Sequence, residues 1–207
     1  GTFVIADLGD ATNGGSLGDS TELLRALLAR RESGQSSGPS TLTVKDLGAV
    51  ERAWQAGEGA SITLKLGTGR SGEFNEMTTV HGTVRRLWEG PVVYSHPAAL
   101  GVVDGPGRVA VTEVDDISLI VHSRPVRIID PAIYSAAGIN ISRQRIVQAK
   151  SHVSYRAGFD SCTSGSVLAD TRGPTAANLA YLPFTRRPKP LFPFEDTEWS
   201  PVATVGE

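Results

Sequence analysis

The sequence predicts one α/β domain, with a mixed β-sheet flanked by helices and a strand-rich middle section. The opening is the first observation behind this prediction. Apolar residues 3–6 lead into a glycine-rich loop at residues 10–21 and then into a leucine-rich amphipathic run, the order of a strand, a loop and a helix. The second observation is that helix-like and strand-like stretches alternate along the chain, as they do in α/β proteins.

Two helices are predicted in the first third of the chain. The leucines within residues 23–28 share one face of a helix expected from Asp19 to about Arg31. Asp46 suits the N-cap of a second helix, which should stop near Gly57. The strands expected in this part cover residues 3–6, 41–44 and 61–66.

Strands dominate the prediction for the middle of the chain. Turns are expected at residues 105–107 and 115–116, and short helices at 132–137 and 151–159. The strands predicted here cover residues 78–87, 92–94, 109–112, 117–121, 146–149 and 167–169.

Residues 67–72 match the Gly-x-Gly-x-x-Gly pattern of dinucleotide-binding loops and follow a predicted strand. Such a loop should open an apolar helix, but residues 73–77 do not have a helical pattern and lead into another strand. We therefore interpret residues 67–72 as a hairpin loop.

Composition excludes several classes of protein. The 207 residues carry a net charge of −2, so there is no basic footprint for nucleic acid. No apolar run approaches the roughly 18 residues of a membrane span. The only cysteine, Cys162, excludes an internal disulfide and fits a reducing compartment, so we expect a cytoplasmic protein. The chain opens almost directly on a strand, which predicts a fragment cut at a domain boundary.

The glycine-rich loop carries the carboxylates Asp10 and Asp19, with Asp7 just ahead of it. A phosphate-binding P-loop needs a lysine where this chain has Asp19, and a carboxylate there repels phosphate. A plain helix cap would explain residues 19–21 but not the glycines or Asp10. The loop therefore predicts a binding or catalytic site that does not hold phosphate.

Lys150 and His152 follow the predicted strand at residues 146–149. Ligands in open α/β sheets bind at the carboxyl ends of strands, so these side chains could face the loop carboxylates. The alternative is a helix N-terminus in which Ser151 caps and Lys150 forms a surface ion pair. The histidines have no spacing typical of a metal site; they are His81, His96, His122 and His152.

The Pro-rich tail covers residues 183–207. The arginine and prolines within residues 187–193 have the spacing that a polyproline-binding groove recognises. We favour the other interpretation, an extended arm laid across its own or a neighbouring domain with Phe192 and Phe194 as anchors.

These elements, in this order, resemble the C-terminal domain of the microcystinase C (MlrC) family of metallopeptidases. That family has a loop of the form Asp-Asn-Pro-Gly-Gly-Gly-x-x-Gly-Asp-Ser/Thr-Thr, which residues 10–21 match except at 11–13. Many relatives carry a His four residues after the strand-end lysine, where this chain has Ser154. The other matching elements are Ser123-Arg124, Gly138-Ile139, Lys150-Ser151, Tyr155-Arg156 and, in the closing segment, residues 170–174 and 182–193.

The resemblance implies half of an enzyme that hydrolyses small or linearised peptides. Zinc would be bound by an N-terminal domain that is absent here, and none is expected on this chain alone, which would be inactive. The chain would interact with that domain and with a peptide substrate, and an apolar face left bare would favour a homo-oligomer. The residues expected to act in catalysis are Asp10, Asp19, Lys150 and His152. Those expected to bind substrate are Asn13, Gly14, Gly15, Gly18, Ser20, Thr21 and Arg124.

Two other functions stay open. The chain could be a non-catalytic regulatory domain that binds a peptide or a partner protein, which the lack of a metal signature and the Pro-rich arm favour. It could also be an independent hydrolase that uses Lys150 and His152 with the loop carboxylates.

Overall fold

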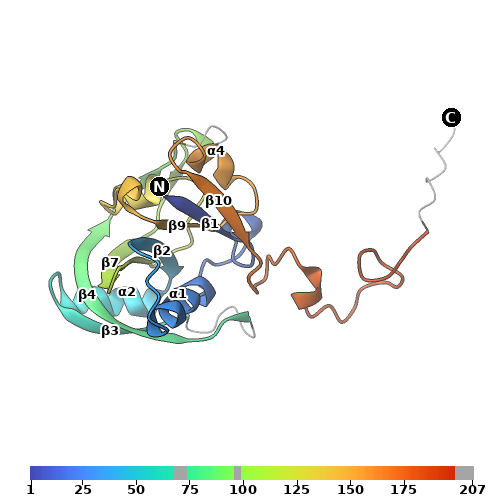
Figure 1. The fold of residues 1–207 in the computed structure, drawn as a ribbon, viewed down its shortest axis with the longest axis horizontal. Helices are drawn as coiled ribbons and strands as arrows, with labels where there is room; N and C mark the ends of the chain where they lie inside the picture. The colour runs from blue at the N-terminus through green and yellow to red at the C-terminus, as the bar shows by residue number, and fades with distance from the viewer. Residues whose placement is uncertain (68–73, 96–98, 199–207) are drawn as a thin grey trace.

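The main sheet of the described residues has eight strands, and helices lie on both of its faces (Figure 1). The computed structural model describes residues 1–67, 74–95 and 99–198. The strands are β1 (Phe3–Asp7), β2 (Ser40–Lys45), β3 (Ser61–Leu66), β4 (Thr78–Glu89), β5 (Val92–Val93), β6 (Val103–Asp104), β7 (Arg108–Val114), β8 (Ile117–His122), β9 (Ile146–Ala149) and β10 (Gly165–Ala169). The helices are α1 (Glu22–Glu32), α2 (Leu47–Ala56), α3 (Ala132–Ala136) and α4 (Tyr155–Phe159), and short 3-10 turns cover Thr12–Gly14, Ile141–Arg143 and Leu179–Tyr181.

The strand order in the main sheet is β10-β1-β9-β2-β8-β7-β4-β3. The five strands from β10 to β8 run parallel to one another, and β7, β4 and β3 run antiparallel to their neighbours. The predicted α/β class with a mixed sheet is therefore confirmed. Strand β9 comes late in the sequence but lies between β1 and β2, so the chain segments that follow all three strands meet at one edge of the sheet.

Each face of the sheet has its own hydrophobic core, and β7 shows how the two are separated. Val109 and Val111 face one core and Ala110 faces the other, as the two-residue period of a strand requires. The core beneath α1 and α2 includes Leu24, Leu27, Leu42, Val50, Leu64 and Leu119. The core beneath α3 and α4 includes Val4, Ile133, Tyr134, Val147, Tyr155 and Phe159.

The ends of the first two helices differ in how well the sequence predicted them. Helix α2 begins as expected, with an oxygen of Asp46 accepting the N–H of Ala49 at 3.0 Å, and it ends before Gly57. Helix α1 begins at Glu22 and not at Asp19, so the predicted start was wrong. The reason is that Thr21 is tied to another segment, with its hydroxyl donating to the carbonyl of Glu76 at 2.6 Å.

Smaller differences affect the second half of the chain. The helix predicted over residues 151–159 is a single turn from Tyr155, and β10 begins two residues before the predicted strand. Strand β6 was not predicted; it pairs only with β5, in a separate two-stranded sheet. In the Gly-x-Gly-x-x-Gly stretch, Gly67 directly follows β3, and the antiparallel pairing of β3 with β4 fits a hairpin; residues 68–72 lie outside the described part of the chain.

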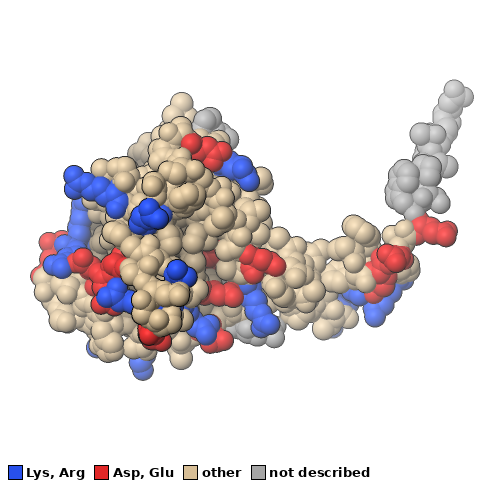
Figure 2. All heavy atoms as spheres, viewed as in Figure 1, with Lys and Arg blue, Asp and Glu red and all other residues tan. Residues whose placement is uncertain are grey.

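After β10 the chain returns to the glycine-rich loop before it leaves the body of the domain. The hydroxyl of Thr171 accepts the N–H of Gly9 at 2.8 Å, and Gly173 packs directly on the carbonyl of Gly9. Beyond residue 181 the tail extends away from the sheet as an arm (Figures 1 and 2). The arm has its own contacts, among them an ion pair of 2.5 Å between Arg187 and Glu195.

The molecular surface carries both signs of charge. On the face shown in Figure 2, basic and acidic side chains are interspersed over the body of the domain. Among the described residues, no helix combines the length and apolar character needed to cross a membrane.

The close packing of Gly173 on Gly9 gives a testable prediction. A Cβ atom at residue 173 would lie 1.9 Å from the carbonyl oxygen of Gly9, so Gly173→Ala should push the returning segment away from the loop. We expect a loss of about 1–3 kcal/mol in the free energy of unfolding, measured with urea. Gly105→Ala is the matched control, because nothing lies within 4 Å of its added Cβ atom. Equal stability of the two variants would contradict this packing.

Candidate functional site

The parallel strands end at one edge of the sheet, and each end carries a buried polar residue. Such groups need partners, because an unpaired polar atom inside a protein costs free energy. Here the pairing brings together segments that are far apart in the sequence. The buried polar residues at this edge are Asp7, Asp46, His122, Gln148, Lys150 and Thr171.

The glycine-rich loop closes over this edge, and Asp10 lies at its centre. One carboxylate oxygen of Asp10 accepts the hydroxyl of Ser16 and, at 2.9 Å, the N–H of Gly18. The other oxygen accepts the N–H of Ser20 at 2.9 Å. Gly15 and Gly18 have φ angles of 101° and 79°, a left-handed conformation that favours glycine. The loop is therefore folded around one carboxylate.

Lys150 holds this carboxylate from the strand side. Its Nζ lies 2.5 Å from Asp10 and 3.8 Å from Asp7, and all three side chains are fully buried. Burial alone would lower the pKa of Lys150, but the two carboxylates raise it above the usual lysine value. The ammonium group therefore stays charged and is held by Asp10.

Asp7 is the second carboxylate of this cluster, and neutral donors complete its surroundings. Gln148 donates its side-chain N–H to Asp7 at 3.0 Å, and the hydroxyl of Thr171 donates to it at 2.5 Å. Burial raises the pKa of Asp7, and the nearby Lys150 opposes this only in part. From the sequence, Asp7 was not predicted to belong to the site, and neither were Gln148 and Thr171.

The structure thus brings Asp10 and Lys150 together, as the strand-end rule predicted. Both are inaccessible, with an exposed fraction of 0% each. A substrate outside the loop cannot touch them in this conformation. Their direct effect is on the shape of the loop.

The exposed part of the loop is its tip, residues 13–15. The N–H of Gly14 donates to the carbonyl of Ala11 at 2.9 Å, and that of Gly15 to Thr12 at 3.3 Å. These two N–H groups close the 3-10 turn, so they are not free to bind a substrate, although the resemblance implied that Gly14 and Gly15 do so. The polar side chain at the tip is that of Asn13, which donates to the hydroxyl of Ser154 at 3.2 Å.

His152 lies beside this tip, half-buried, and does not reach Asp10. Its Nε2 is 2.8 Å from the carbonyl of Thr175, whose side chain contacts the loop through Ala11 and Leu8. Because a carbonyl can only accept, Nε2 carries the proton, and in the neutral ring Nδ1 is left as an acceptor. The exposed rim of the site therefore consists of residues 13–15, His152, Ser154 and Thr175, and we call it the rim below.

The other predicted residues occupy different places. Gly18, Asp19, Ser20 and Thr21 are buried behind the tip, and the carbonyl of Asp19 accepts the side-chain N–H of Asn75 at 2.6 Å. Arg124 is exposed at the same edge of the sheet, just past β8.

His122 is fully buried, and the sequence did not distinguish it from the other three histidines. Its Nδ1 donates to the carbonyl of Arg124 at 2.7 Å, and within the described residues its Nε2 has no hydrogen-bond partner. Burial, together with a smaller effect of the nearby Lys150, lowers the pKa of His122 to about 4, although the hydrogen bond to Arg124 opposes this shift. Its position at the end of the predicted strand, like that of Lys150, was a signal that could have found it.

A family model matches most of the chain. Residues 5–186 match the family described as MlrC C-terminus. The chain belongs to this family. The resemblance inferred from the glycine-rich loop is therefore confirmed over most of the sequence.

Two relatives show what the matched region is part of. Microcystinase C from Sphingomonas sp. is 27% identical over 194 residues, which cover 93% of this chain and 36% of that protein. A crystal structure from Mesorhizobium sp. BNC1, named "Putative metallopeptidase", has a TM-score of 0.85 and 28% identity, and the match covers 96% of this chain and 39% of that one. This MlrC C-terminal chain thus spans little more than a third of the length of either relative.

The metallopeptidase names imply a metal ion, but the side chains at this edge do not fit one. Among the described residues there is no group of three His, Cys, Asp or Glu that could hold a metal. The carboxylates of Asp7 and Asp10 are occupied by Lys150, Gln148, Thr171 and loop donors. A lysine ammonium against a carboxylate excludes a cation from the same place.

The buried pair between Lys150 and Asp10 gives the second prediction. Lys150→Met should lower the free energy of unfolding by about 3–5 kcal/mol, because it leaves the carboxylate of Asp10 buried without its counter-charge. The double variant Asp10→Asn/Lys150→Met should lose less than the sum of the single variants. The control is Arg85→Met, which breaks an exposed pair with Glu113 and should cost less than about 1 kcal/mol. Urea unfolding measures all four; additive losses would contradict the coupling.

The third prediction concerns pH. From pH 6.5 down to about 4, the unfolded chain binds a proton at His122 that the folded chain does not. The free energy of unfolding should therefore fall by about 3 kcal/mol as the pH drops through this range, apart from the contributions of the carboxylates. His122→Asn removes this contribution and should flatten the pH dependence of urea unfolding by that amount. His81→Asn changes an exposed histidine and should keep the wild-type slope; equal slopes for all three proteins would overturn the prediction.

Proposed function

We propose that this chain is the C-terminal domain of a metallopeptidase that hydrolyses small or linearised peptides. The rim would form one wall of the substrate cleft, and the metal, which we take to be zinc, would be held by the remainder of a longer protein. Membership of the MlrC C-terminus family supports this assignment, as do the two relatives, which extend well beyond the matched region. The observation that carries the rim assignment is the buried Asp10–Lys150 pair, which fixes the loop beneath exposed polar groups.

In this proposal the buried and exposed residues have different roles. Asp10 and Lys150 are positioning residues, because neither can touch substrate in this conformation. Asp19, Gly18, Ser20 and Thr21 belong to the same support, behind the tip. Asn13 would hydrogen-bond the peptide, and Arg124 would attract a substrate carboxylate.

His152 is the proposed proton-transfer group of this wall. It is half-buried at the rim, and its ring is oriented by the hydrogen bond from Nε2 to Thr175. Nδ1 is then free to accept a proton from a substrate or a water molecule. The metal, when bound elsewhere in the cleft, would supply Lewis-acid activation of water.

A graft tests the assignment. This chain would replace the corresponding region of microcystinase C, and hydrolysis of linear peptides would be measured with and without a metal chelator. We expect metal-dependent hydrolysis by the graft and none by the isolated 207 residues supplied with zinc. Full activity of the isolated chain would contradict a shared site.

Within the active graft, His152→Gln should lower kcat by about a hundredfold with little change in KM. The glutamine can still donate to Thr175 but cannot act as a base near neutral pH. His81→Asn, a distant exposed histidine, is the control and should leave kcat unchanged. If turnover survives both His152→Gln and replacement of the loop tip, the chain is a peptide- or partner-binding domain and the catalytic assignment fails.

A further inference from the structure

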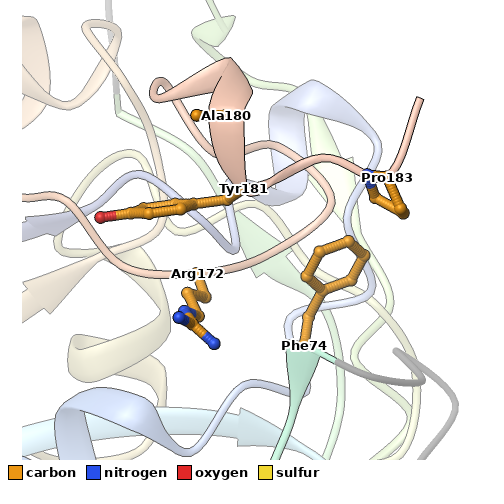
Figure 3. Close-up of a pocket in the computed structure, with 5 residues that line it drawn as sticks. All are labelled: Phe74, Arg172, Ala180, Tyr181 and Pro183. Atoms are coloured by element: carbon orange, nitrogen blue, oxygen red, sulfur yellow. The ribbon is translucent and has the colours of Figure 1, made fainter.

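A pocket of about 230 Å³ lies beside the buried end of the glycine-rich loop and is separate from the rim. Figure 3 shows the residues that line it: Phe74, Arg172, Ala180, Tyr181 and Pro183. Two hydrogen bonds fix the segments that form it. Asn75, next to Phe74, donates to the carbonyl of Asp19 at 2.6 Å, and Glu22 accepts the N–H of Arg172 at 2.7 Å.

Arg172 gives this pocket its charge. Its guanidinium lies 5.6 Å from the ring centroid of Tyr181, within reach of a cation–π interaction. Within the described part of the chain, its side chain makes no ion pair and no hydrogen bond. The carboxylate of Glu22 accepts the backbone N–H of Arg172 and attracts its charge, but forms no ion pair with the guanidinium. The planar donors of the guanidinium are therefore available to a carboxylate, which they can bind in a bidentate manner.

Apart from Ala180, the rest of the lining consists of rings, those of Phe74, Tyr181 and Pro183. In Figure 3 the ring of Phe74 points toward Pro183, and Arg172 lies under the ring of Tyr181 in this view. The apolar faces of these lining side chains can pack against the aromatic ring of a ligand. The volume of about 230 Å³ is below the roughly 300 Å³ at which pockets for drug-sized ligands begin, so the occupant would be small.

We propose that this pocket binds a small aromatic carboxylate, whose carboxylate pairs with Arg172 while its ring packs against Phe74 and Pro183. Two sources share this chemistry, a free aromatic acid and an aromatic residue at the C-terminus of a peptide. The site stands apart from the rim and does not depend on the peptidase assignment, so it can be tested on the 207-residue chain itself.

Calorimetric titration of the chain tests the proposal with two probes. 3-Phenylpropionate represents the free acid and N-acetyl-L-phenylalanine the peptide end; the tighter of the two identifies the source. We expect saturable binding with a Kd in the range of about 1 mM, typical of a weak small ligand. N-acetyl-L-phenylalanine amide lacks the carboxylate and acetate lacks the ring, and each should bind at least about tenfold more weakly, since each loses one of the two interactions.

Two arginine variants test whether the probes bind in this pocket. Arg172→Gln should weaken the better probe at least about tenfold, because it removes the charged bidentate donor. Arg156→Gln is the matched control: Arg156 is also exposed and lies 5.7 Å from the ring centroid of Tyr155, but it does not line the pocket. It should leave the Kd unchanged. Urea unfolding of each variant checks that the fold is intact.

Three outcomes would overturn the proposal. They are no saturable binding of either probe, equal binding of acetate or the amide, and an equal loss of affinity in the Arg156→Gln and Arg172→Gln proteins. If Arg172→Gln is unstable, Tyr181→Leu, which removes one ring of the wall and leaves the guanidinium, replaces it and should weaken both probes.

Discussion

The constraint on which the rest of this structure depends is the burial of the Lys150 ammonium. Moving a charge from water into the protein interior costs several kcal/mol, so the group must find a counter-charge there. Asp10 supplies it at 2.5 Å, and the remaining capacity of that carboxylate is taken by Ser16, Gly18 and Ser20. If the glycine-rich loop left this arrangement, the buried Lys150 would lose its 2.5 Å partner and keep only the 3.8 Å contact with Asp7. The shape of the loop is therefore tied to the end of β9.

In this arrangement the residues that hold the loop in place are different from those that face solvent. The charged groups lie inside, where the ion pair and hydrogen bonds hold them, and the residues that face solvent at the tip are neutral and small. Two of the positions noted above as departures from the family pattern, Asn13 and Ser154, touch each other at the rim. A change at one would alter the surroundings of the other, while the buried pair beneath them stays the same.

Local signals made much of the fold predictable. Asp46 before an amphipathic stretch located the start of α2, and the alternating pattern of residues 61–66 located β3. The meeting of Lys150 with the loop followed from the rule that ligand sites form at strand ends. The roles of Gln148 and Thr171 did not, because they depend on β9 entering the sheet between β1 and β2 and on β10 pairing at the outer side of β1. No local pattern in the sequence specifies that order.

The conformation of the glycine-rich loop could not be predicted for the same reason, because it depends on residues distant in the sequence. Gly14 and Gly15 were expected to bind substrate, but the 3-10 turn at Thr12–Gly14 uses their N–H groups internally. What fixes the turn is distant in sequence, since Thr175 bonds to Ala11 and the carbonyl of Lys150 accepts the N–H of Thr12 at 3.2 Å. The segment after β10 carries both Thr175 at the rim and Arg172 in the neighbouring pocket. Because Thr171 anchors that segment to Asp7, the buried charge cluster sets the position of both surfaces.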